Sequence, residues 1–249
     1  MHTETTVEGT RFCVLGDRRA TPAPLLLLLA MDAEQTLTTL PYARLGQILA
    51  ERGCMIVSLD LPCHGLDRRT GEPEQLAGWA ARLAQGEDIA APFCARVGQV
   101  IEHLIDTGVA ASERIASAGT SRGGFMAFQA AAANARIRAV AGFAPVTDLG
   151  ALTEFAGQTG NPVVARLGLT NAVPRLADRA AWITIGGRDE RVGTDRTVAF
   201  AETLRRAAAA QGLAPRVILN VVDTPGHASF VEWHERAAEW LMEPGVWGK

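Results

Sequence analysis

The chain has 249 residues, of which 48% are hydrophobic and 20% charged, a composition that excludes wholesale disorder and is typical of a globular α/β-sized domain. The net charge is −3 and the arginines are scattered, which excludes the concentrated positive patch that a nucleic-acid-binding surface requires. The four cysteines form no C-x-x-C pair, so neither a zinc motif nor a disulfide framework is indicated.

The chain shows no pattern that predicts a targeting segment. Its first residues lack the basic and apolar stretches of a signal peptide, and the apolar run Leu25–Ala30 is too short to span a bilayer. We therefore expect a cytoplasmic protein with neither a membrane nor a nucleic-acid partner. A homo-oligomer is compatible with the sequence.

From residue 25 onward, short apolar runs alternate with longer amphipathic stretches. In chain order they predict strand Leu25–Ala30, helix Pro41–Arg52, strand Cys54–Leu59, helix Asp88–Asp106, strand Arg114–Ala118, helix Phe125–Asn134, strand Ile137–Ala144, strand Ala180–Gly186, helix Thr194–Gln211, strand Arg216–Val222 and helix Phe230–Met242. The last helix is expected to bury Phe230, Trp233, Ala237 and Trp240. Thr5–Leu15 predicts an antiparallel edge. The alternation indicates an α/β fold with a doubly wound, mostly parallel sheet and helices on both faces.

Two segments show no clear period. Residues 65–87 and 149–179 are longer than ordinary connections, and loops of that length in a compact domain are usually functional or locally folded. We expect a single domain over residues 1–249, with these two segments forming a small cap around the mouth of an active site.

The sequence Gly119-Thr-Ser121-Arg-Gly123-Gly124 matches the pattern G-x-S-x-G. It follows a predicted strand and opens a predicted helix, the arrangement that exposes a nucleophilic serine at a tight turn. Such a turn strains the serine backbone and requires neighbours without side-chain bulk. A serine that merely caps the helix is the alternative interpretation. The context favours Ser121 as a nucleophile.

A serine nucleophile needs a base, and the base needs an orienting group. Where this turn occurs, serine, acid and histidine follow one another in chain order. Of the histidines after Ser121, His234 falls inside the last predicted helix. His227 lies in a turn just past the strand Arg216–Val222, at the carboxyl edge of the sheet. His227 is therefore the predicted base.

Several carboxylates follow Ser121, including Asp148, Asp178, Asp189, Glu190, Asp195 and Asp223. Asp189 is preferred because it directly follows the strand Ala180–Gly186 and so emerges at the same sheet edge as the serine. Asp148 is the rival, although a helix cap at Leu149 would also explain it.

These motifs resemble those of the α/β-hydrolase superfamily over nearly the whole chain, from about Leu25 to Leu241. Asp60-Leu-Pro-Cys-His64-Gly65 is similar to a D-x-P-x-H-G segment of that superfamily, and the Ser-Arg-Gly-Gly turn is similar to that of its prolyl-oligopeptidase-like and dienelactone-hydrolase-like members. The resemblance implies Ser121 as nucleophile, Asp189 as acid and His227 as base, with His64 structural.

The oxyanion hole departs from the pattern of this superfamily. Many members carry His-Gly-x-Gly after the first central strand, whereas this chain has Ala30-Met31-Asp32-Ala33. Backbone N–H groups of Arg122 and of either Met31 or Asp32 are the predicted donors. The Asp32 side chain is then expected to point away from the hole and to cap the next few residues of the chain. Trp79 and Phe93 are candidates for an acyl pocket, with core packing as the alternative.

The predicted activity is that of a serine hydrolase that cleaves a small carboxylic ester through an acyl-enzyme intermediate, with no metal or organic cofactor. A peptidase or amidase is a second candidate, although such enzymes normally carry a gating domain. Thioester hydrolysis on the same residues is a third. A ligand-binding protein that kept the fold without turnover is the alternative from another class.

Overall fold

The computed structural model describes residues 1–16 and 22–247. Within these residues eight strands form one sheet: β1 His2–Thr5, β2 Arg11–Leu15, β3 Ala23–Leu29, β4 Met55–Ser58, β5 Ala110–Thr120, β6 Ile137–Phe143, β7 Ala180–Arg188 and β8 Val217–Pro225. Their order is β1-β2-β4-β3-β5-β6-β7-β8. Strands β3 to β8 are parallel, and β1 and β2 form an antiparallel hairpin at the edge. The predicted α/β class is therefore confirmed.

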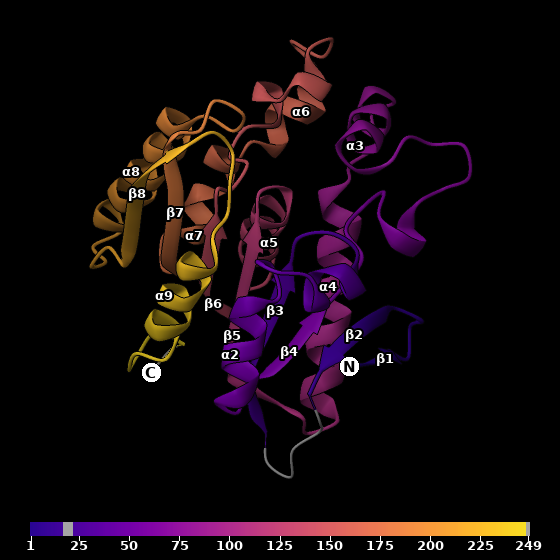
Figure 1. Cartoon of the computed structure of the whole chain (residues 1–249), viewed down its shortest axis with the longest axis vertical. Coiled ribbons are helices and arrows are strands. Elements are labelled where there is room, and N and C mark those ends of the chain that lie inside the picture. Colours follow the sequence, from indigo (N-terminus) through magenta and orange to yellow (C-terminus); the bar gives the residue numbers. More distant parts are fainter. Residues whose placement is uncertain (17–21, 248–249) are drawn as a thin grey trace.

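The helices of the described residues are α1 Ala33–Thr38, α2 Arg44–Glu51, α3 Gln75–Ala84, α4 Ala90–Asp106, α5 Arg122–Ala133, α6 Pro162–Leu167, α7 Val173–Leu176, α8 Thr194–Ala210 and α9 Val231–Leu241. The connection β3–α2–β4 runs along the sheet in one direction, and the connections through α4, α5 and α8 run in the other (Figure 1). Right-handed crossovers therefore place α2 on the face opposite α4, α5 and α8. Helix α9 packs against α2.

The core lies around the central strands and α5. Each leucine of Leu25–Leu29 is at most 1% exposed, as expected for a parallel strand covered on both faces. Gly119 of β5 pairs with Leu29 of β3 and with Gly142 of β6. A Cβ on Gly142 would lie 2.9 Å from the Phe128 ring of α5, so the close approach of this helix to the sheet depends on that glycine.

Residues 65–87 and 149–179 fold into short helices. The first segment holds η1 Gly65–Asp67 and α3, and the second holds η2 Leu149–Ala151, η3 Thr153–Phe155, α6, η4 Leu169–Ala172 and α7. In Figure 1, α3 and α6 both lie at the upper end of the molecule. Gln158 Nε2 donates to the Ala80 carbonyl at 2.7 Å, and Asn161 Nδ2 donates to the Leu83 carbonyl at 2.9 Å. The two segments are thus tied to each other.

Two local features differ from the sequence prediction. Helix α1 had no predicted counterpart, because six residues are too few to show a helical period. The burial of Phe230 was wrong: its side chain is 39% exposed, whereas Trp233, Ala237 and Trp240 are buried. The helix begins at Val231, and Phe230 has the extended backbone of a cap residue, which takes it off the buried stripe.

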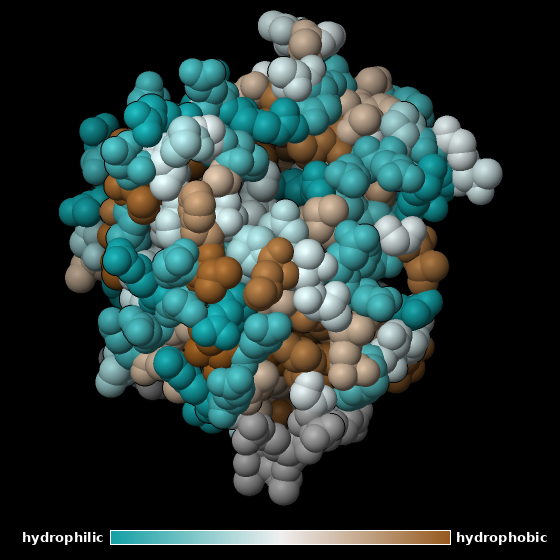
Figure 2. Space-filling model, in the orientation of Figure 1, coloured by the Kyte–Doolittle hydropathy of each residue, from teal (hydrophilic) through white to brown (hydrophobic). Residues whose placement is uncertain are grey.

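Hydrophilic side chains cover most of the face shown in Figure 2, with single apolar ones between them. Such isolated exposed hydrophobic residues are normal on a protein surface and mark no interface by themselves. Of the helices in the described parts of the chain, none has both the length and the apolar character needed to cross a membrane.

Candidate active site

Ser121 lies at the turn between β5 and α5. Its backbone has φ 54° and ψ −115°, a conformation that costs about 1–3 kcal/mol for a residue with a side chain. The glycines around it are required by space: a Cβ on Gly119 would lie 2.3 Å from the Gly123 backbone, and one on Gly123 would lie 2.0 Å from the Leu29 carbonyl oxygen. The Ser121 N–H donates to the Phe143 carbonyl at 2.8 Å, which holds the turn against β6. The geometry is that of a nucleophile elbow.

The structure brings the three predicted catalytic side chains together. His227 Nε2 lies 2.9 Å from Ser121 Oγ, and His227 Nδ1 lies 2.8 Å from Asp189 Oδ2. An ionised carboxylate only accepts hydrogen bonds, so Nδ1 carries the imidazole proton and Nε2 is the acceptor for the serine hydroxyl. This tautomer lets His227 take the serine proton as the hydroxyl attacks.

Asp189 is held in its ionised form by hydrogen bonds. Its side chain is fully buried, and its Oδ1 accepts from the backbone N–H groups of Arg191 at 3.0 Å and Val192 at 3.2 Å. Burial by itself would raise the pKa of Asp189, but the hydrogen bonds from His227, Val192 and Arg191 outweigh it and lower that pKa. The carboxylate is therefore available to orient His227 at neutral pH.

The rival acid and the other histidines have structural roles. Asp148 Oδ1 accepts from the Gly150 N–H at 2.9 Å and so caps η2. His234 is fully buried, and its ring stacks on Phe143 with centroids 3.9 Å apart. Burial lowers the pKa of His234 to about 3, so it is neutral. His64 is also buried, and its Nδ1 lies 2.8 Å from the Pro62 carbonyl oxygen.

The predicted oxyanion donors differ in the hydrogen bonds that they already make. As the first residue of α5, Arg122 has an N–H without an intrahelical acceptor. The Met31 N–H is already used, because it donates to Thr36 Oγ1 at 3.0 Å. Asp32 Oδ1 accepts from the Gln35 N–H at 2.8 Å, so this carboxylate caps α1, as expected. Of the two alternatives for the second donor, Met31 lines the pocket at Ser121 although its N–H is engaged, whereas Asp32 lines a different pocket.

A pocket of about 210 Å³ opens at the nucleophile. Its lining includes the loop after β3, the elbow, α3 and the histidine loop: Ala30, Met31, Tyr42, Leu76, Thr120, Ser121, Arg122, Arg191, His227, Ala228 and Ser229. Leu76 of α3 thus brings residues 65–87 to the nucleophile. Tyr42 and Arg191 also line this pocket and were not among the residues predicted from the sequence. The signals were weak: Tyr42 is the single tyrosine of the chain, and Arg191 follows Asp189 by two positions.

The prediction that Trp79 and Phe93 line an acyl pocket was wrong. Both side chains are 0% exposed, and neither lines the pocket at Ser121. Trp79 packs on the Phe125 ring at a centroid distance of 5.9 Å and donates from Nε1 to the Pro62 carbonyl at 2.6 Å. Both aromatic residues belong to the core that supports α3, α4 and α5.

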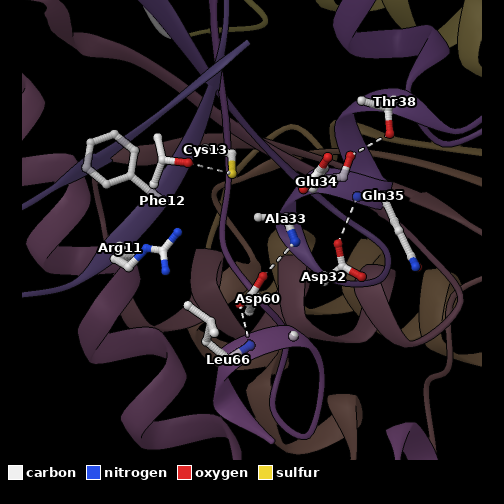
Figure 3. A pocket seen from close by; sticks show the side chains of 12 residues that line it. Arg11, Phe12, Cys13, Asp32, Ala33, Glu34, Gln35, Thr38, Asp60 and Leu66 are labelled. Atoms are coloured by element: carbon white, nitrogen blue, oxygen red, sulfur yellow. Dashed lines mark hydrogen bonds between the residues drawn. The ribbon is translucent and has the colours of Figure 1, made fainter.

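A larger pocket of about 560 Å³ is lined by residues that include Asp32 and Asp60 (Figure 3). Two of its carboxylates, those of Asp32 and Asp60, hold the local backbone: Asp32 caps α1, and Asp60 accepts from the N–H groups of Ala33 at 2.8 Å and Leu66 at 2.9 Å. Ser121, His227 and Asp189 do not line it. Among the described residues, no group of three or more histidine, cysteine or acidic side chains is arranged to hold a metal ion.

Solved structures of similar fold include both esterases and peptidases. TT1662 from Thermus thermophilus has 22% identity and a TM-score of 0.72, with 97% of this chain and 98% of that one covered. Acetyl xylan esterase 1 from Thermoanaerobacterium sp. JW/SL YS485 has 16% identity and a TM-score of 0.65, covering 96% and 81%. Porphyromonas gingivalis dipeptidyl peptidase 4 has 15% identity and a TM-score of 0.68, and there 96% of this chain spans only 34% of the peptidase.

The open, mostly parallel sheet and the serine elbow define an α/β hydrolase. The sequence profile of the prolyl oligopeptidase family matches residues 97–243, and the chain belongs to that family of serine hydrolases. A comparison with curated protein sequences gives no match.

Proposed function

We propose that the protein hydrolyses small carboxylic esters, with Ser121 as nucleophile, His227 as general base and Asp189 as the acid that orients it. The observation that carries the proposal is the continuous hydrogen-bond chain from Ser121 Oγ through His227 to the buried Asp189, at 2.9 and 2.8 Å. Both the burial of the Asp189 carboxylate and the strained backbone of Ser121 lower the stability of the fold. Such features persist at sites where the chemistry needs them.

The reaction proceeds in two acyl transfers. Ser121 Oγ attacks the ester carbonyl carbon while its proton passes to His227 Nε2, and the carbonyl electron pair becomes an oxyanion. The N–H group of Arg122 and a second N–H group from Met31 or Asp32 stabilise that charge; losing one such donor typically costs about 2.7–4 kcal/mol. The C–O bond to the alcohol then breaks as His227 returns the proton to the departing oxygen.

Water completes the cycle. A water molecule gives a proton to His227 and attacks the acyl carbon, the bond to Ser121 Oγ breaks, and the serine recovers its proton as the carboxylic acid leaves. The pocket of about 210 Å³ is smaller than the roughly 300–1,000 Å³ sites of drug-sized ligands, which favours a small substrate.

A serine peptidase is the second candidate, and the family match favours it. The same residues would protonate a leaving amine instead of an alcohol. An amide or thioester bond therefore needs no change in the catalytic groups, and substrate assays must decide between these bonds.

Two measurements test the proposal. A fluorophosphonate probe should label Ser121, with the adduct located by mass spectrometry, and Ser121→Ala should abolish labelling. Ser112→Ala is the matched control, because Ser112 lies near the other end of the same strand, nine positions before Ser121. A panel of p-nitrophenyl esters assayed beside peptide and thioester substrates should show esters turned over fastest. Labelling elsewhere than Ser121 would contradict the assignment.

A further inference from the structure

Arg122 is a cation in the serine pocket that lacks an acidic partner. Its Nε lies 3.4 Å from the Ala30 carbonyl oxygen, and one terminal nitrogen lies against Met31 Sδ. Neither contact provides a negative charge, and no carboxylate among the described residues forms an ion pair with this guanidinium. Its five N–H groups are thus largely unused by the protein.

The two buried arginines of the described residues are neutralised, whereas Arg122 is half-buried. Arg82 forms ion pairs with Asp67 at 2.8 Å and with Glu72 at 2.6 Å. Arg179, whose side chain is 6% exposed, pairs with Asp178. A guanidinium partly removed from water loses hydration, and a charged partner offsets that loss. Because Arg122 is half-buried in a pocket and has no ion-pair partner among the described residues, we take its partner to come from outside the chain.

The whole pocket favours an anion. Its lining contains two arginines and no aspartate or glutamate. Arg191 is already paired with Glu154 at 2.5 Å, so that carboxylate is engaged by the other arginine and forms no ion pair with Arg122. Burial is the main cause that lowers the pKa of Arg122, and the neighbouring Arg191 lowers it as well, whereas Tyr42 and Glu154 act in the opposite direction. Tyr42 also lines the pocket and adds a neutral hydroxyl donor.

We propose that the Arg122 guanidinium, with the Tyr42 hydroxyl beside it, binds a carboxylate carried by the substrate, so that the preferred esters are anionic ones. The planar fork of arginine matches a carboxylate through two parallel hydrogen bonds. Because Arg122 follows Ser121 directly, the anionic group lies near the scissile carbonyl. The inference rests on the proposed ester hydrolysis and adds its substrate class.

Matched ester pairs test this selectivity. One pair places the carboxylate on the acyl side (mono-p-nitrophenyl adipate and its methyl ester), and the other places it on the alcohol side (4-acetoxybenzoate and its methyl ester). The measured quantity is the kcat/KM of the anionic ester divided by that of its neutral partner. A hydrogen-bonded charge pair predicts a ratio of about 10–100 for one pair in the wild type. The gain should appear mainly in KM.

Variants then assign the selectivity to Arg122. Arg122→Gln should bring the ratio near one, Arg122→Lys should leave an intermediate ratio because it keeps the charge without the fork, and Tyr42→Phe should lower the ratio less. Arg196→Gln is the matched control: it removes an exposed arginine that does not line the pocket, and should leave the ratio unchanged. Retained fluorophosphonate labelling shows that each variant is folded around Ser121.

The outcomes separate the inference from the function on which it rests. Equal rates on anionic and neutral esters by a wild type that is labelled at Ser121 would overturn the anion site and leave ester hydrolysis standing. A preference that survives Arg122→Gln would also overturn it. A wild type that neither reacts with the probe nor turns over any ester would remove both proposals.

Discussion

Replacing Asp189 by asparagine changes one atom and reverses the hydrogen-bond polarity that His227 experiences. Asp189 Oδ1 accepts from the N–H groups of Arg191 and Val192, at 3.0 and 3.2 Å. In the variant, the amide oxygen must take this place, because an NH2 group there would face two donors. The amide nitrogen then faces His227 Nδ1 and donates to it.

The consequence is an imidazole in the wrong tautomer. With Nδ1 as an acceptor, the proton moves to Nε2, which lies 2.9 Å from Ser121 Oγ and can no longer accept the serine proton. The loss expected for a wrong tautomer is about 10⁴-fold in kcat, or about 5.5 kcal/mol of transition-state stabilisation. KM should change little, because asparagine has nearly the shape of aspartate and does not line the pocket.

The assay is the steady-state hydrolysis of p-nitrophenyl acetate at neutral pH, together with the rate of fluorophosphonate labelling. Asp148→Asn is the matched control, since Asp148 caps η2 through an oxygen that asparagine retains, and it should keep wild-type rates. The reasoning is refuted by a folded Asp189→Asn protein within tenfold of the wild-type kcat, or by an equal loss in Asp148→Asn.

Further predictions concern the nucleophile, the elbow and a buried histidine. Ser121→Ala should lower kcat about a millionfold and His227→Ala nearly as much, with the double variant hardly worse because the groups act as a unit; additive losses in single-turnover assays would contradict this. Gly123→Ala should destabilise the fold by at least about 1–3 kcal/mol, because its Cβ would lie 2.0 Å from the Leu29 carbonyl oxygen, and an unchanged urea midpoint would refute that explanation. Burial holds the pKa of His234 at about 3, so below the ordinary value of about 6.5 only the unfolded state binds the proton. The free energy of unfolding should therefore fall by up to about 1.4 kcal/mol for each unit by which the pH is lowered below that value. His234→Phe should reduce this pH dependence in urea titrations between about pH 7 and 5.

Local patterns explain why the strands and the elbow could be predicted. The strand expected at Ile137–Ala144 is β6, Ile137–Phe143, because its apolar run is buried along its length. The strand expected at Arg114–Ala118 is longer in the structure, where β5 spans Ala110–Thr120. Its first half carries partly and fully exposed residues, so hydrophobicity did not reveal it.

Side-chain surroundings could not be predicted in the same way. Trp79 lies on a helix beside the active site, and its residue type did not show whether its ring faces the pocket or the core. The oxyanion alternatives depended on Thr36, which occupies the Met31 N–H only once α1 has formed. The absence of a carboxylate from the pocket lining beside Arg122 likewise depends on which residues meet in the folded protein.

The sequence alone determined the order of the central strands and the longer helices, the strained turn at Ser121 and the positions of Asp189 and His227 at the ends of strands. These follow from short stretches of chain, in which periodicity and glycine spacing act locally. Only the tertiary structure decided which distant groups meet: the 2.8 and 2.9 Å contacts of His227, the engagement of the Met31 N–H by Thr36, and the contact of Arg122 with a carbonyl oxygen in place of an ion pair. The physical reason is that hydrogen bonds, burial and charge compensation depend on neighbours in space, which no local pattern specifies.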